Sequence, residues 1–362
     1  MFTYWGRRGA MAQFALDLGR AALASQEVSA LLSISRQNEN FDAYTELGPA
    51  LCPVDTFRSN IGAVVHACRI PRLRRLILEQ IKQHKVKAVI ELMPHAWSRF
   101  AIGADLRRLG VRYATIIHDA EPHPGDWTAA LNWWLDTAAL DADVVLTLSA
   151  AVAQRLKARG NIPSSKIRSL FHPELGYGPS LRPTPPATDE PLRLLFLGRI
   201  MAYKGLSLFL DAVDEVRNRG VPVQVGVFGE GKLGRNAARL DAMGAEVVNR
   251  WLTAQEVGTI LRRFHAVVLS HIEASQSGVA AAAMHAGLPV VATPVGGLTE
   301  QITDGVTGLL AKRAEATALS EAIVRLRDPD LYRAICDGIA GTHERRSMAT
   351  FVKAAVSLVL NA

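Results

Sequence analysis

The chain has 362 residues, of which 49% are hydrophobic and 21% charged, a composition typical of a globular protein long enough for two domains. No apolar run reaches the roughly 18 to 20 residues that cross a bilayer, and the first residues lack the order of a signal peptide, so we expect a cytoplasmic protein. The three cysteines, Cys52, Cys68 and Cys336, lack metal-ligand spacing and are expected to be reduced thiols.

Much of the net charge of +7 lies in one segment of the first half, residues 69–85. Apolar residues recur there at helical spacing, and basic residues fall mostly on another face. The apolar positions are Leu73, Leu76, Ile77 and Ile81, and the basic ones are Arg72, Arg75 and Lys82. Two interpretations stay open: a surface helix packed on a sheet, which we favour, or a helix contacting anionic lipid at the membrane surface. No nucleic-acid motif accompanies the charge, so we expect no nucleic-acid partner.

Short apolar strands alternate with helical stretches along the whole chain, the pattern of a doubly wound α/β fold. The strands are continuous in Val, Ile and Leu, as is typical of parallel strands buried on both faces. Strands are expected at residues 87–92, 111–119, 143–149, 192–198, 223–229, 266–271 and 289–294, and helices at 10–24, 206–220 and 253–264. The fold class is therefore two Rossmann-like parallel-sheet domains.

The one break in this pattern is residues 176–190, which are rich in proline and glycine and are expected to form a linker. The sequence thus predicts an N-terminal domain at 1–175, a C-terminal domain at 191–345 and a last helix at 346–362, which could pack back on the N-terminal domain. Ligands of open parallel sheets bind at the carboxyl ends of the strands.

Two features of the second half suit a bound diphosphate. Arg199 directly follows an expected strand, and Lys204 lies five residues later, beside a glycine. In another loop, Ser277 and Gly278 precede a helix that begins near Val279, and helix N-termini attract anions. An ordinary solvated loop would explain either feature alone, but the recurrence in one domain favours phosphate binding.

These residues belong to a larger set that recurs in a known family. The set is Gly198-Arg199 with Lys204-Gly205, Gly229 and Gly231, Asn249-Arg250-Trp251, Glu273 and residues 286–310. The second half thereby resembles the nucleotide-sugar-binding domain of the group 1 (family four) glycosyltransferases, whose GT-B fold has two such domains facing a cleft. The first half matches more loosely, through Gly6 and Gly9 after a short first strand, His118-Asp119 at a strand end, and Ser149.

The resemblance implies roles one residue at a time. Arg199 and Lys204 would hold the donor diphosphate, helped by the backbone of Ser277, Gly278 and Val279. Glu273 would bind hydroxyls of the transferred sugar, and His118 would lie in the cleft near the reacting carbon. Gly6, Gly9 and Asp119 would belong to cleft loops. The donor is a nucleotide diphosphate sugar, and neither a metal nor a cofactor is implied.

Two departures from the family stand out. A second glutamate, which commonly holds the nucleotide ribose, is replaced by Ala281, or by Ala282 if one residue is inserted. Either a subgroup with an EASQSG loop uses other groups there, which we favour because the other site residues remain, or donor binding has been lost. The short first strand also leaves open whether the true start codon lies upstream.

Three other motifs point elsewhere. GEGKLG at 229–234 fits a dinucleotide fingerprint but follows the second strand of its domain, so NAD binding is not expected. Asp141 and Asp143 imitate a metal-binding D-x-D motif but precede a strand instead of following it. Asp119, Glu121, His123 and Asp126 could supply metal ligands, but prolines stiffen that segment and a cleft loop is favoured.

The sequence therefore predicts a metal-independent retaining glycosyltransferase that moves a hexose to an acceptor hydroxyl. We expect it to act in exopolysaccharide or lipid-linked saccharide synthesis, in the cytoplasm or at the cytoplasmic face of the membrane. Two alternatives stay open: a nucleotide-sugar 2-epimerase of the same fold, and a non-catalytic homologue acting as a partner subunit. The donor base, the hexose, the acceptor and the oligomeric state are not specified.

Overall fold

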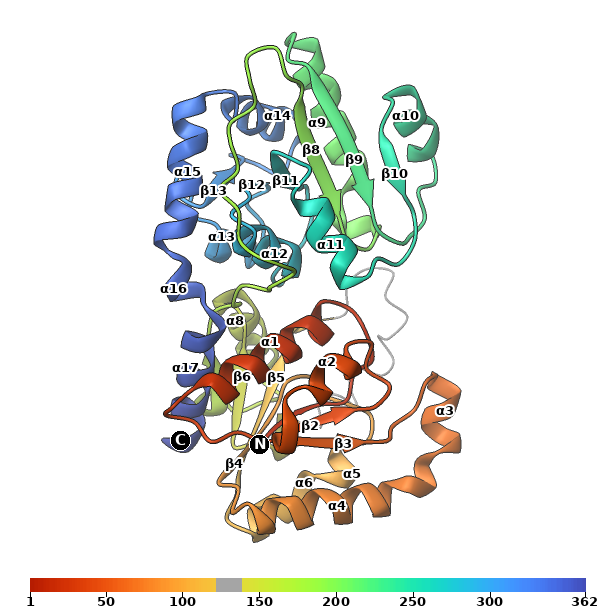
Figure 1. The fold of residues 1–362 in the computed structure, drawn as a ribbon, viewed down its shortest axis with the longest axis vertical. Helices are drawn as coiled ribbons and strands as arrows, with labels where there is room; N and C mark the ends of the chain where they lie inside the picture. Colours follow the sequence, from red (N-terminus) through yellow and green to blue (C-terminus); the bar gives the residue numbers. More distant parts are fainter. Residues whose placement is uncertain (122–138) are drawn as a thin grey trace. The chain divides into compact units, whose positions relative to one another are not determined.

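The computed structural model describes residues 1–121 and 139–362, which form two compact units (Figure 1). One unit holds residues 1–121, 139–171 and Ser347–Ala362, and the other holds His172–Arg346. Each unit is a parallel sheet with helices on it. The predicted class, two doubly wound α/β domains, is confirmed.

The sheet of the first unit has seven parallel strands in the order β3-β2-β1-β4-β5-β6-β7. Their bounds are β1 Phe2–Tyr4, β2 Leu32–Ser35, β3 Leu51–Val54, β4 Ala88–Glu91, β5 Arg112–Ile117, β6 Val144–Thr147 and β7 Ile167–Ser169. β4, β5 and β6 were predicted from their apolar runs. β3 carries Pro53 and lies at the edge, where a missing N–H costs no ladder hydrogen bond.

Helices surround this first sheet. They are α1 Ala10–Ala24, α2 Phe41–Thr45, α3 Asn60–Val65, α4 Ile70–Gln83, α5 Ser98–Ala101, α6 Gly103–Arg108, α8 Ala150–Arg159 and α17 Met348–Leu360, with short 3-10 turns at Gly48–Ala50, Ala67–Arg69 and Ser164–Lys166. The C-terminal helix α17 packs on α1, where the rings of Phe14 and Phe351 meet edge to face with centroids 5.5 Å apart. The end of the chain is therefore part of the first unit's core.

The second unit has six parallel strands in the order β10-β9-β8-β11-β12-β13. Their bounds are β8 Leu192–Leu197, β9 Val223–Phe228, β10 Glu246–Val248, β11 Ala266–Leu269, β12 Val290–Ala292 and β13 Gly308–Leu310. The central strand β8 reads LRLLFL, and five of its six residues are buried. Burial of this apolar strand on both faces explains why its sequence does not alternate.

The helices of the second unit cover both faces of its sheet (Figure 1). They are α9 Leu206–Asn218, α10 Asn236–Ala242, α11 Ala254–Leu261, α12 Gly278–His285, α13 Leu298–Gln301, α14 Ala316–Arg325, α15 Pro329–Gly341 and α16 His343–Arg346, with a 3-10 turn, η4, at Ala202–Lys204. The predicted helices at 10–24, 206–220 and 253–264 correspond to α1, α9 and α11.

Residues 176–190 form no helix or strand but run along the second unit. The N–H of Leu181 donates to the Ala286 carbonyl at 3.2 Å, and the guanidinium of Arg327 donates to the Glu190 carbonyl at 2.7 Å. This proline-rich segment is therefore held by hydrogen bonds from elements far along the chain. Among the helices described, none is long and apolar enough to cross a membrane.

Candidate functional site

The candidate phosphate-binding loops of the second unit lie at the carboxyl ends of β8 and β11. Gly205, which ends η4, has φ of +69°, and a Cβ added to it would lie 1.9 Å from the Ser270 carbonyl oxygen just after β11. Only glycine lets the two loops approach so closely. A Cβ added to Gly198, directly after β8, would lie 3.4 Å from Cγ2 of Val279 in the first turn of α12. The loop of Arg199 and Lys204 therefore adjoins both the end of β11 and the start of α12.

Lys204 is held in place by a side chain that the sequence did not single out. Its Nζ lies 2.8 Å from Nε2 of His271, and its ammonium stands 5.4 Å from the centroid of the Tyr203 ring. His271 is 3% exposed. Because an ammonium group can only donate, Nε2 of His271 accepts this bond and the imidazole is neutral. The N–H of Ile272 donates to the Tyr203 carbonyl at 2.8 Å, which joins the two loops directly.

The first turn of α12 presents backbone N–H groups beside these cations. Ser277 caps the helix by accepting the Ala280 N–H at its Oγ. Its own N–H donates to Oε1 of Gln301 at 2.7 Å, and the Gln301 amide donates back to the Ser277 carbonyl at 3.1 Å. The Ser277 N–H is thus already engaged within the protein. The next N–H groups, those of Gly278 and Val279, have no acceptor inside the helix by helical geometry and are the ones suited to an anion.

Glu273 lies on the loop between β11 and α12 and is partly buried. The segment after β12 packs closely against that loop, since a Cβ added to Gly296 would lie 1.8 Å from the Ala274 carbonyl oxygen. Within the part of the chain described, Oε1 of Gln276 is buried without a hydrogen-bond partner. A buried acceptor without a donor destabilises the protein, because its lost contact with water is not replaced. A ligand hydroxyl can supply the missing donor.

The position of the missing second glutamate lies inside α12. Ala281 is 2% and Ala282 3% exposed. Three neighbouring positions of the helix, Ala280, Ala283 and Met284, are also buried. Small side chains along this helix let it pack close to the sheet.

The candidate residues of the first unit also lie at the carboxyl ends of strands. His118 follows β5, and its Nε2 donates to the Leu92 carbonyl at 2.8 Å. Burial lowers the pKa of His118, while the hydrogen bond to Leu92 and the charge of Asp119 act against that shift. His118 is therefore neutral near neutral pH and has Nδ1 as an acceptor.

The loop of Gly6 and Gly9, between β1 and α1, is shaped by residues after β2. The Gly9 N–H donates to Oε1 of Glu39 at 2.7 Å, and the Asn38 amide donates to the Gly6 carbonyl at 3.2 Å. Gly9 has φ of +99° and stands at the N-terminus of α1. Sequence reasoning missed Asn38 and Glu39, since they lie about 30 residues from the loop they hold.

A buried carboxyl at the end of β4 is a further feature of the first unit. Glu91 is 2% exposed, and its Oε2 accepts from the Tyr113 hydroxyl at 2.6 Å. Burial raises the pKa of Glu91, against the lowering effect of its hydrogen bonds from Ser98, Tyr113 and Thr115. Nearby, burial lowers the pKa of His95 to about 3, and its ring stacks on Phe57 at 4.8 Å. In the sequence, Glu91 stood out only as an acidic residue near the end of the apolar run of residues 87–92.

The structure explains two of the motifs that were set aside. Gly231 of the GEGKLG segment makes two hydrogen bonds with the Asn249 side chain. The Gly231 N–H donates to the amide oxygen at 3.0 Å, and the Asn249 amide N–H donates to the Gly231 carbonyl at 2.9 Å. Asp143 accepts the Tyr113 N–H at 2.9 Å at the entry to β6, and Asp141 pairs with Arg99 at 3.5 Å. Neither aspartate is placed as a D-x-D ligand after a strand. Two of the alternative metal ligands, His123 and Asp126, lie outside the described residues.

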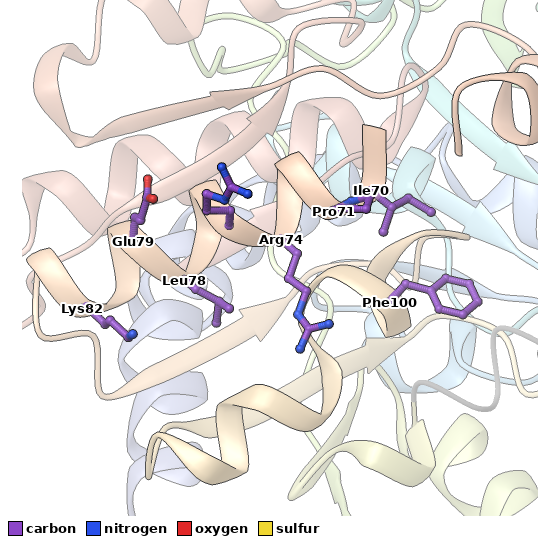
Figure 2. A pocket seen from close by; sticks show the side chains of 8 residues that line it. Ile70, Pro71, Arg74, Leu78, Glu79, Lys82 and Phe100 are labelled. Carbon is purple, nitrogen blue, oxygen red and sulfur yellow. The ribbon is translucent and has the colours of Figure 1, made fainter. Parts of the chain in front are cut away.

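The basic helix α4 buries one apolar stripe. Leu73, Ile77 and Ile81 are buried, whereas Leu76, expected on the same face, is 36% exposed. Arg72, Arg75 and Lys82 are exposed. Nε of Arg74 lies 2.5 Å from Oδ2 of Asp105. Figure 2 shows a pocket along α4 and α5, lined by Ile70, Pro71, Arg74, Arg75, Leu78, Glu79, Lys82 and Phe100.

Comparison with solved structures identifies the class of fold. The chain is similar to a mutant of TarM from S. aureus, solved with Fondaparinux, alpha-GlcNAc-glycerol and UDP, with a TM-score of 0.70 at 11% identity over 100% of this chain and 99% of that chain. Anabaena Alr3699/HepE in complex with UDP-glucose gives a TM-score of 0.69 at 13% identity, over 99% and 98% of the two chains. The two units thus have the GT-B fold of glycosyltransferases.

Comparison of sequences identifies the family. Residues 191–328 match the family model for glycosyl transferases group 1, and residues 34–171 match the model for glycosyltransferase family 4. The two segments together make up more than half of the chain. The chain therefore belongs to the group 1 glycosyltransferases, with a family 4 segment before the group 1 segment.

Relatives of the chain carry the names of several different glycosyltransferases. D-inositol 3-phosphate glycosyltransferase of Paenarthrobacter aurescens is 32% identical over 42% of this chain and 40% of its own length. Alpha-D-kanosaminyltransferase of Streptomyces kanamyceticus is 23% identical over 74% of this chain and 73% of its own length. The amylovoran biosynthesis glycosyltransferase AmsK of Erwinia amylovora is 27% identical over 51% of this chain and 47% of its own length. The chain spans less than half the length of the inositol phosphate and amylovoran relatives.

Proposed function

We propose that the chain is a retaining glycosyltransferase that moves a hexose from a nucleotide diphosphate sugar to an acceptor hydroxyl without an essential metal. One observation carries the proposal. Lys204, fixed by His271, and Arg199 lie on a loop that adjoins the first turn of α12 at the carboxyl edge of a parallel sheet. Two cations and a helix N-terminus are the groups that bind a diphosphate.

The same groups suit departure of the nucleoside diphosphate. When the bond from the sugar carbon to the phosphate oxygen breaks, negative charge grows on the diphosphate. Arg199, Lys204 and the N–H groups of Gly278 and Val279 stabilise that charge, which is the role a metal ion has in other transferases. The acceptor oxygen then bonds to the sugar carbon, and its proton passes to the leaving phosphate.

The sugar and the ribose need separate partners. We assign the hydroxyls of the transferred hexose to Glu273, and His118 to hydrogen bonding near the reacting carbon through its acceptor Nδ1. In place of the second glutamate of the family, we assign the ribose to the EASQSG loop, where the buried Oε1 of Gln276 is an acceptor suited to a hydroxyl. The bound UDP and UDP-glucose of structural neighbours support a nucleotide sugar as donor.

The acceptor is a saccharide or a lipid-linked saccharide, and we propose that the protein works at the cytoplasmic face of a membrane in polysaccharide synthesis. The amylovoran relative supports the pathway class. The surface of α3 and α4 supports the location, since exposed basic residues of α4 accompany the exposed Ile61, Val64 and Val65 of α3. Exposed apolar and basic side chains on consecutive helices are the kinds of group that contact anionic lipid.

A thermal-shift panel of UDP, GDP and ADP sugars tests the proposal and names the donor base. A ligand at about 100 times its Kd stabilises the protein by about 2.7 kcal/mol, which is a clear shift in unfolding temperature. Product analysis with the best ligand then separates transfer from 2-epimerisation, since an epimerase releases no sugar to an acceptor. If no nucleotide sugar in the panel shifts the unfolding temperature, the protein is better described as a non-catalytic subunit.

A further inference from the structure

A second cluster of chemically competent side chains lies in the second unit, away from the start of α12. Glu174 is 4% exposed and lies shortly after His172, where the described part of this unit begins. Its Oε2 lies 2.5 Å from Nδ1 of His343 on α16 and 3.7 Å from Nδ1 of His285 at the end of α12. These three atoms all lie within 4.8 Å of one another.

We propose that Glu174, His285 and His343 bind one divalent transition-metal ion of the zinc class. Zinc bonds of about 2.0 to 2.2 Å in tetrahedral geometry place ligand atoms about 3.3 Å apart. The two Glu174–histidine separations, 2.5 Å and 3.7 Å, bracket this value, and no two of the three ligand atoms are more than 4.8 Å apart, so side-chain rotations can bring all three to one ion. Two imidazoles and one carboxylate leave the fourth position to water.

Hydrogen bonds outside the cluster orient its members as they do in known metal sites. Nε2 of His285 lies 3.2 Å from the Gly178 carbonyl, so it carries the hydrogen and leaves Nδ1 toward Glu174. The other carboxylate oxygen, Oε1 of Glu174, accepts from Nη2 of Arg346 at 2.7 Å and from Nε at 2.9 Å. A carbonyl behind a ligating histidine and a fixed carboxylate are typical supports of metal ligands.

The charges select the class of ion. Arg346 already neutralises Glu174, so the cluster offers little net negative charge to a hard cation such as Mg²⁺ or Ca²⁺. Two imidazole nitrogens instead favour Zn²⁺, Co²⁺ or Ni²⁺. The C-terminal end of α12, where the helix dipole is negative, adds a modest attraction for any cation.

The ion would have a structural role, at a position separate from the proposed donor site. α12 spans Gly278–His285, and eight residues of helix are about 12 Å long, so an ion at His285 does not reach phosphates at Gly278. It would tie together the segment that opens the second unit, the end of α12 and the helix that closes the unit at Arg346. This inference is independent of the proposed transfer reaction.

Calorimetric titration of the chelator-treated, dialysed protein with ZnCl2 alone tests the site. We expect saturable one-to-one binding that weakens by more than about tenfold in His285→Ala and in His343→Ala. The control His84→Ala removes an exposed histidine at the end of α4 and should bind zinc as the wild type does. Binding should also weaken as pH falls, because protons compete for the imidazoles.

Glu174→Gln is a less decisive variant, since it leaves Arg346 without its carboxylate partner and could unfold the segment. The two histidine side chains are 27% and 52% exposed, so their variants should fold, which circular dichroism checks. Visible absorption of the Co²⁺ complex reports coordination directly. A wild type without saturable zinc binding, or folded histidine variants that bind zinc like the wild type, would overturn the proposal.

Discussion

The ammonium of Lys204 and the imidazole of His271 lie 2.8 Å apart, although 67 residues separate them along the chain. A buried imidazole that accepts a hydrogen bond from a lysine fixes the direction of the lysine's ammonium group. A preorganised cation binds an anionic ligand with less loss of side-chain entropy than a mobile one. We therefore treat this pair as the anchor of the proposed diphosphate site.

Lys204→Ala should weaken the binding of a nucleoside diphosphate and of the corresponding nucleotide sugar by a similar factor, because both ligands make the contact that the substitution removes. Loss of one charge-assisted hydrogen bond corresponds to about 1.5 to 3 kcal/mol. His271→Phe should also weaken the binding of both ligands, but only while Lys204 is present. Calorimetry on the two single variants and the double variant measures this coupling. Equal effects of His271→Phe with and without Lys204 would mean that His271 acts only on the fold.

Glu273→Ala should distinguish the sugar from the diphosphate. It removes a hydrogen bond to the hexose, so affinity for the nucleotide sugar should fall by about 1.5 to 3 kcal/mol while affinity for the bare diphosphate stays nearly unchanged. The matched variant Gln276→Leu should instead weaken both ligands, since the ribose is common to them. If Glu273→Ala weakens the bare diphosphate as much, or unfolds the protein, Glu273 is a structural residue.

Replacing Arg72, Arg75 and Lys82 with glutamine should reduce sedimentation with anionic liposomes, since each charge near a membrane surface contributes about 1 kcal/mol. Arg74→Gln is the matched control on the same helix, because Arg74 is paired with Asp105. It should have a smaller effect than any single change among the three. A wild type that does not sediment with these liposomes would end the membrane proposal.

His265 should make stability depend on pH. Burial, then the positive charge of Arg193, lowers its pKa to about 4, with Glu190 acting against the shift. The unfolded chain therefore takes up this proton at a higher pH than the folded chain does, so stability is full above about pH 6.5 and falls as pH decreases toward 4. The loss from this group is on the order of 2 kcal/mol near pH 5.

Urea unfolding of the wild type and His265→Gln at neutral pH and near pH 5 checks this dependence. The variant should be less stable at neutral pH, because His265 Nδ1 accepts the Arg193 N–H at 3.0 Å. It should nevertheless lose less stability on acidification than the wild type. Parallel losses in the two proteins would assign the acid sensitivity to other groups, such as His95.

The longer apolar strands of both sheets could be predicted from the sequence. Residues 192–198 and 223–229 carry long runs of buried apolar residues, and a parallel sheet is their simplest structure. The short strands β7, β10 and β13 have three residues each and leave no periodic signal. β2 reads LSIS, and Oγ of its buried Ser33 accepts a hydrogen bond from the Trp5 indole. No local sequence pattern predicts that this serine is buried.

The sequence offered Arg199 and Lys204 as candidate site residues because they follow an expected strand, and Glu273 through the resemblance to the family; their roles stay predictions. Their supporting partners could not be predicted. Gln301 lies 24 residues from Ser277, and Glu39 lies 30 residues from Gly9. Such pairs form only when loops from different strands meet at one edge of a sheet, so they depend on the tertiary fold and not on local spacing.

The most direct test of the account is calorimetric titration of UDP, GDP and ADP in the presence of EDTA, with the wild type and Lys204→Ala side by side. We predict that one of these nucleotides binds the wild type despite the chelator, because protein cations replace a metal at the diphosphate. We also predict that Lys204→Ala weakens that nucleotide by about tenfold or more. Absence of binding for all three nucleotides, binding only after Mn²⁺ is added, or equal affinity in both proteins would contradict the account.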